Sequence, residues 1–151
     1  MGLFYLVSRS NSALSTTADL LTIQAAAGRS IKIHEIAVAG MGTASAANEL
    51  GIFRQTALGA TAATFIVPEK TNPALPASAF TANTAWTTQP AISAVALLRL
   101  GVNANGGVFR WVAKPGQEIE LPGSATFTGA LSLRSVVGAS NVSIHIIVEE
   151  I

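Results

Sequence analysis

The sequence has no cysteine, a single aspartate and few charged residues of any kind. Without cysteine it can form no disulfide, no thiolate nucleophile and no Cys-ligated zinc site. Charged residues make up 11% of the chain and aromatic residues 6%, whereas soluble domains contain about 25% charged residues. Because a monomer needs a polar surface, so little charge predicts that other subunits or partners cover part of this surface.

Long apolar runs and clusters of basic residues are also missing. No stretch approaches the roughly 18 apolar residues that a membrane helix requires. No basic residue precedes the short apolar run at 3–7, as a secretory signal would need. The net charge of +1 provides no electrostatic footprint for nucleic acid. We therefore expect a soluble, unprocessed chain with no membrane and no nucleic acid among its partners.

β-Strand patterns dominate what is present. Apolar and β-branched residues alternate in eight to ten short segments, which Gly, Pro and Asn separate. In the segment 30–40 the alternation changes phase at His34 and Glu35, which predicts a β-bulge or a bend. We therefore expect a single domain over 1–151, an all-β, antiparallel, jelly-roll-like β-sandwich or barrel. Its residues 1–18 are expected to contain a first strand or to form an arm.

The segment 69–90, EKTNPALPASAFTANTAWTTQP, has no clear periodicity and no charge after Lys70. Its prolines remove backbone donors, so it is not expected to join a sheet. Disordered segments normally carry more charge than this one. We therefore expect a long ordered loop, packed by Phe80 and Trp86 against its own sandwich or against a neighbouring subunit, and presented at a contact surface.

The segment 91–102 follows this loop and is apolar on both faces of a strand. Alanine and leucine in 91–100 also allow a short helix, but the flanking turn signals favour a strand. Val95 and Leu97 would form the second apolar face, although a sandwich strand needs only one buried face. We expect the long loop or a neighbouring subunit to cover this second face.

No constellation of catalytic residues is recognisable. His34 and His145 each have a carboxylate nearby, but a metal site would form only if their strands pair and further ligands join them. A single aspartate and the lack of a G-x-S-x-G motif argue against a Ser-His-Asp triad. The glutamate pairs 118/120 and 149/150 are better explained as solvated faces of strands than as paired catalytic acids. We expect no enzyme, no cofactor and no bound metal.

Single charges on apolar strands suggest a further set of contacts. Four arginines fall within predicted strands: Arg54, Arg99, Arg110 and Arg134. They either face solvent and prevent edge-to-edge pairing, or they pair with Glu35, Glu49 or Glu149 of a neighbouring subunit. The residues expected at an interface are Phe80, Trp86, Pro90, Val95, Leu97, Arg99 and Arg54.

Several stretches between residues 30 and 150 carry a resemblance to a known family. They are IKIHEIAVAG, ELGIFRQTALG, TNPALPASAF, TAWTTQP, GVFRWVAKPGQEIELPG and the final VSIHIIVEE. Their pattern resembles a group of small virion proteins of tailed bacteriophages, the jelly-roll capsid decoration (cement) proteins and related minor structural proteins.

The resemblance implies a jelly roll that trimerises and lies on the outer surface of a phage capsid, after synthesis in the cytoplasm of the bacterial host. It implies that the partner is the major capsid protein, whose subunit contacts the bound trimer stabilises, and it implies no cofactor. Two alternatives stay open. A glycan- or receptor-binding jelly-roll module of a tail or fibre would need more aromatic and acidic residues, and a cupin-like enzyme would need clustered histidines.

Overall fold

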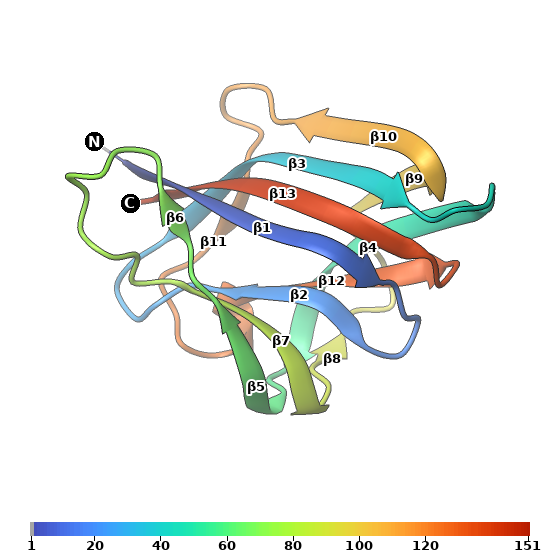
Figure 1. Cartoon of the computed structure of the whole chain (residues 1–151). Coiled ribbons are helices and arrows are strands. Elements are labelled where there is room, and N and C mark those ends of the chain that lie inside the picture. The colour runs from blue at the N-terminus through green and yellow to red at the C-terminus, as the bar shows by residue number, and fades with distance from the viewer. Residues whose placement is uncertain (1) are drawn as a thin grey trace.

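The structure, a computed structural model, describes residues 2–151 with the exception of the side chains at positions 62 and 63. It contains thirteen β-strands and one 3-10 helix, η1 (Phe127–Gly129). The strands form two antiparallel sheets that pack face to face (Figure 1), which confirms the expected all-β sandwich. Within the described residues, no helix has the length and apolar character needed to cross a membrane.

The two sheets, A and B, have different strand orders. Sheet A runs β10 (Asn105–Val112), β3 (Ile31–Met41), β13 (Asn141–Glu150), β1 (Leu3–Ala13) and β6 (Glu69–Lys70), with β11 (Ile119–Leu121) also paired to β3. Sheet B runs β5 (Ala60–Ile66), β7 (Thr81–Thr88), β2 (Asp19–Gln24), β12 (Ala130–Val137), β4 (Ala47–Ala57) and β8 (Ala91–Ile92), with β9 (Leu98–Asn103) also paired to β4. The count exceeds the expected eight to ten because β6, β8 and β11 have only two or three residues.

The N-terminal segment is a strand of sheet A and not a free arm. β1 pairs with β13 from Leu3, opposite Glu150, to Ala13, opposite Asn141. In β13 and in the first half of β1, buried residues alternate with residues on the outer face, as a strand with one buried face requires. The two ends of the chain therefore lie side by side (Figure 1).

The predicted change of phase in β3 is a β-bulge. Ile147 lies opposite Glu35 and Val148 lies opposite Ile33, so His34 has no partner of its own on β13. The extra residue shifts the alternation by one position, so that Ile31 and Ile33 before it and Ile36 and Val38 after it all face the core.

A single apolar core lies between the two sheets. Sheet A contributes mainly through alternate residues of its strands, whereas β2, β4 and β12 of sheet B are also buried at consecutive residues. Its largest fully buried side chains are Tyr5, Phe80, Leu20, Leu21, Ile23, Ile31, Ile33, Ile36, Leu50, Ile52, Leu100 and Leu121. Full burial of one such side chain contributes about 1.5–3 kcal/mol, so this core holds the surface elements in place.

The prediction of one long loop over 69–90 is wrong for its second half. Residues 81–88 form β7, which pairs with β2 on one side and with β5 on the other. Threonine is favoured in strands, and TANTAWTT is rich in it. The three prolines of the segment all lie outside strands, where they remove no ladder hydrogen bond. The irregular loop is therefore only 71–80.

The prediction of one continuous strand over 91–102 is also wrong. The alternative, a short helix over 91–100, is not observed either. β8 and β9 are separated by a bend at 93–97. Serine and alanine have weaker strand propensity than the β-branched residues, and they occupy 93 and 94. The second apolar face therefore exists only as the exposed side chains of this bend.

Sheet B curls at one end. There β4 continues into β5 through residues 58–59, while β7 continues into β8 through 89–90. β8 then pairs back onto β4, with Ala91 opposite Ala57. β5, β7 and β8 consequently lie together at the bottom of Figure 1, and we call this region the curled end.

Candidate functional site

The stretch without charge, between Lys70 and Arg99, is the surface that the sequence marks most clearly. Two of its apolar side chains are strongly exposed in the bend 93–97. Val95 is 77% exposed and Leu97 is 47% exposed. An exposed apolar pair of this kind, with Arg99 as its nearest charge in the sequence, is typical of a surface that another molecule covers.

The backbone of this bend is fixed to β4. The Ser93 N–H donates to the carbonyl of Arg54 at 2.9 Å, and the Leu97 N–H donates to the carbonyl of Ile52 at 2.7 Å. The Ser93 hydroxyl also donates to the carbonyl of Val95 at 2.8 Å. The two apolar side chains therefore project from a backbone whose position is set before any partner arrives, which lowers the entropic cost of binding.

The loop 71–80 is anchored to sheet A at its C-terminal end. Phe80 is 2% exposed, and its ring meets that of Tyr5 edge to face at 5.6 Å. The Tyr5 hydroxyl donates to the carbonyl of Pro76 at 3.2 Å. The buried carboxylate of Glu150 accepts from the Ala79 N–H at 2.7 Å. The expectation that Phe80 packs this segment against its own sandwich is thus confirmed.

The curled end encloses a buried polar network around the sole aspartate. Asp19 Oδ1 accepts from Arg134 Nε at 2.6 Å, and Asp19 Oδ2 accepts from the hydroxyls of Thr22 and Ser132. Arg134 Nη2 also donates to the carbonyl of Pro90 at 3.0 Å. The ion pair is almost fully buried, with 12% of the Arg134 side chain and none of the Asp19 side chain exposed. It ties the β7–β8 connection to β2 and β12.

Trp86 closes this network and does not project into solvent. It is half-buried, and its Nε1–H donates to Thr22 Oγ1 at 3.0 Å. Gly59 lies directly against its ring, where a larger residue would clash. Its role is therefore that of a plug in its own domain, the first of the two alternatives that the sequence left open.

Replacing Trp86 with phenylalanine is expected to lower the free energy of unfolding by about 1 kcal/mol or more, because the bond to Thr22 is lost and the smaller phenyl ring packs less well than the indole. Urea denaturation of the two proteins measures this difference. Exchanging the exposed Phe65 for leucine serves as a control that should leave stability within about 0.5 kcal/mol. Equal stability of W86F and the unchanged protein would show that the indole bond contributes nothing.

The structure separates the expected interface residues into two groups. Phe80 and Pro90 are buried in their own domain, so they are not available as contact residues. Val95, Leu97 and Arg99 are accessible, and they lie together on the bend and at the start of β9. Arg54 is on β4 beside the bend, and its Nη1 donates to the carbonyl of Glu120 at 3.0 Å.

The carboxylates considered for pairing between subunits have partners within the chain. Arg99 Nη1 lies 2.8 Å from Glu49 Oε1. Arg110 binds Glu35 through two hydrogen bonds of 2.6 Å, which lower the pKa of the Glu35 carboxyl. These internal pairs mean that Glu35 and Glu49 do not need a partner from a neighbouring subunit.

Pairing of β3 with β13 does bring the two histidine strands together. His34 Nε2 lies 2.7 Å from Glu149 Oε2, and the Phe4 ring lies 5.4 Å from the His34 ring. Among the described residues there is no group of three or more His, Cys, Asp or Glu side chains that could hold a metal ion. A His–Glu hydrogen bond is therefore the arrangement that the geometry supports.

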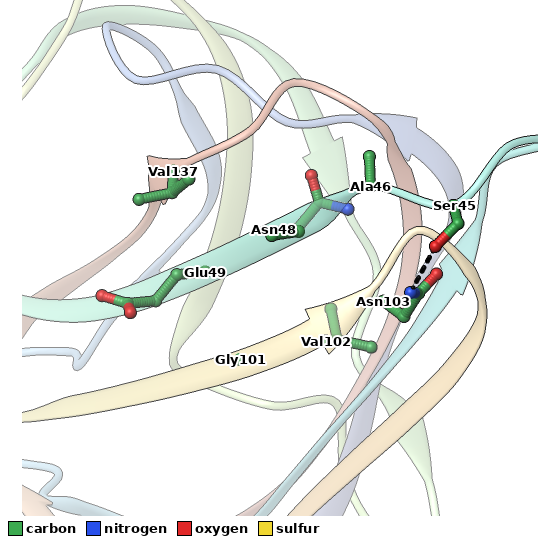
Figure 2. Close-up of a pocket in the computed structure, with 9 residues that line it drawn as sticks. Ser45, Ala46, Asn48, Glu49, Gly101, Val102, Asn103 and Val137 are labelled. Carbon is green, nitrogen blue, oxygen red and sulfur yellow. Dashed lines mark hydrogen bonds between the residues drawn. The ribbon is translucent and has the colours of Figure 1, made fainter.

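A shallow concavity of about 510 Å³ lies between β4, β9 and the end of β12 (Figure 2). Asn103 on its wall is bound to Ser45 Oγ at 2.8 Å. Asn48 is 3% exposed and its amide has no hydrogen-bond partner within the described residues. Gly138 lies close against that amide, where a side chain would clash with Asn48 Oδ1. The lining thus mixes alanine and valine side chains with polar ones and the carboxylate of Glu49.

The sequence did not reveal the network around Asp19 or the anchoring role of Glu150. A lone aspartate at the start of an apolar strand, in DLLTIQ, was the available signal. A buried aspartate needs a cation as its partner, and Arg134, in another predicted strand, was the candidate. The sequence predicts that Glu150 is solvated, because nothing in the pattern of its strand shows that loop 71–80 covers its side chain.

No protein-family model and no curated protein sequence matches the chain. Two solved structures to which it is weakly similar are chains of viral particles. One belongs to "KBV activated particle at acidic pH", with 14% sequence identity and a TM-score of 0.29. This match covers 95% of this chain and 58% of that chain. Another belongs to the "T13 IBDV viral particle", with 10% sequence identity and a TM-score of 0.22. This match covers 99% of this chain and 39% of that chain.

The chain thus spans less than two thirds of the length of either neighbour. Similarity at these TM-scores assigns neither a fold nor a function. The architecture described above rests on the strands and their pairing alone.

Proposed function

We propose that this chain is a structural protein of a tailed-bacteriophage virion. In this proposal it binds the outside of the capsid as a homo-oligomer, a trimer by resemblance, and stabilises contacts between major capsid subunits. A symmetric oligomer engages several shell subunits at once and gains avidity from them. The role is mechanical and not catalytic.

The observation that carries the proposal is the uncharged, pre-positioned surface around the bend 93–97. Val95 and Leu97 project from a backbone fixed to β4, within a stretch of the chain that carries no charge at all. Such a surface fits an apolar, uncharged partner and gives binding that depends little on salt, because few charges take part. The sequence resemblance supplies the identity of that partner.

The proposal predicts that changing Val95 and Leu97 together to aspartate weakens capsid binding at least tenfold, since two charges would be buried against an apolar partner. The measurement is sedimentation of the protein with capsids assembled without it. Because both side chains are exposed, thermal stability should not change.

Met41→Asp is the matched control, because Met41 is 49% exposed and Leu97 47%, and Met41 lies on β3 of the other sheet. It should bind capsids as the unchanged protein does. Capsid binding that survives the double aspartate change would rule out the bend as the docking surface. Absence of binding by the unchanged protein would rule out the virion role.

A further inference from the structure

β10 forms an open edge of sheet A, with regular pairing to β3 from Val108 to Val112. It pairs with β3 on one side, and no described strand pairs with its other side. It lies along the top of the molecule in Figure 1. Natural proteins protect such edges with charges, prolines or short strands, because an open edge is a template for another chain.

The hydrogen-bonding groups that β10 leaves free can be assigned from its ladder. The Ala113 N–H donates to the His34 carbonyl at 2.8 Å, which marks 113 as a position bonded to β3. Bonded positions alternate in an antiparallel pair. The N–H and C=O groups of Val108, Arg110 and Val112 therefore point away from β3, toward solvent.

The side chains at these free positions are suited to pairing. Val108 is 74% exposed and Val112 is 51% exposed. Arg110 between them is the only charged residue of the strand, and its bidentate bond to Glu35 compensates that charge within the chain. An incoming strand therefore does not have to supply a carboxylate.

The residue pattern of this edge is a palindrome. Residues 108–112 read Val, aromatic, Arg, aromatic, Val. If two copies of the strand run antiparallel about a two-fold axis at Arg110, each Val108 lies opposite a Val112. Each Phe109, 39% exposed, then lies opposite a Trp111. Apolar and aromatic cross-strand pairs of this kind stabilise a sheet.

We propose that β10 pairs with β10 of a second copy of this chain, antiparallel and centred on Arg110, so that the two A sheets become one continuous sheet. The like charges at the centre are each held by their own Glu35. This contact has two-fold symmetry, so it is different from the three-fold contact of a trimer. If a trimer also uses it, two trimers join into an assembly of six copies. It does not depend on binding to a capsid.

The other edges of the two sheets are less suited to this role. β6 has two residues and both are charged. The edge at β9 is interrupted, because β9 begins directly after the bend 93–97. β5 contains Thr61 with a φ of 45°, outside the extended conformation that continuous pairing requires.

The first test uses the unchanged protein and hydrogen exchange. The amides of residues 108, 110 and 112 have no partner within the described chain, so they should exchange fast in a monomer and slowly in the paired form. Protection should increase with protein concentration. The amides of 109 and 111 bond to β3 and are internal references whose protection should stay constant.

The second test changes Val108 to proline. Proline removes the free N–H at an outward position and spares the ladder with β3, and Gly107 before it tolerates the restriction that proline imposes. Light scattering after size exclusion should show an even number of copies for the unchanged protein and half that mass for V108P. Double replacement of Val108 and Val112 by lysine should give the same halving without any backbone change.

A mass of one or three copies for the unchanged protein, with fast exchange at 108, 110 and 112, would overturn the proposal. So would a mass that neither variant alters. Either result leaves capsid binding by the bend 93–97 untouched, since that binding is measured on capsids with different residues changed.

Discussion

Replacing Asp19 with alanine is expected to lower the free energy of unfolding by about 3–5 kcal/mol, the usual effect of removing one partner of a buried ion pair. The change leaves the guanidinium of Arg134, which is 12% exposed, without its counter-charge. The hydroxyls of Thr22 and Ser132 lose their acceptor at the same time. Equilibrium denaturation measures the loss, at one fixed protein concentration because oligomers gain stability by mass action.

Glu49→Ala is the matched control for this experiment. It removes the partner of Arg99 from an ion pair whose side chains are 57% and 31% exposed, and exposed pairs contribute about 0–1 kcal/mol. If D19A and E49A reduced stability equally, the network of the curled end would have no special part in holding β7 and β8 against β2.

Replacing Phe80 with alanine is expected to cost about 3–5 kcal/mol, the range for removing a buried aromatic side chain. The ring is 2% exposed, and it packs edge to face on Tyr5 at the point where loop 71–80 joins β7. The cavity would lie under the loop, so limited proteolysis should also cut 71–80 faster in this variant.

The same chemical change at Phe65 supplies the control, because that ring is 68% exposed. F65A should stay within about 0.5 kcal/mol of the unchanged protein. A small loss for F80A, together with unchanged proteolysis of 71–80, would mean that the loop is held by Glu150 and Tyr5 without help from the ring.

Regular alternation was the part of the fold that sequence reasoning recovered. The last strand and the phase change at His34 were readable because one buried face imposes a two-residue period. The predictions that were wrong concern segments whose structure depends on the strands beside them. TANTAWTT became β7 because β2 and β5 offer it two open edges, and no local pattern announces such neighbours.

The candidate site was recovered only in part, for a related reason. Exposure of Val95 and Leu97 depends on a break in the strand, whereas burial of Phe80 and Pro90 depends on what folds over them. Both are tertiary properties. The lack of charge was visible in the sequence, but which of those uncharged side chains face outward was not.

The pairing of β1 with β13 has a consequence for the order of events in the cell. These strands join residues as far apart as Leu3 and Glu150, and β13 separates β1 from β3 in the sheet. Sheet A therefore cannot assemble until residues 141–150 have left the ribosome. Non-local pairing of this kind also slows folding, to roughly milliseconds or seconds. Until then the apolar side chains of β1 and β3 remain uncovered, and the nascent chain depends on chaperones or dilution to avoid aggregation.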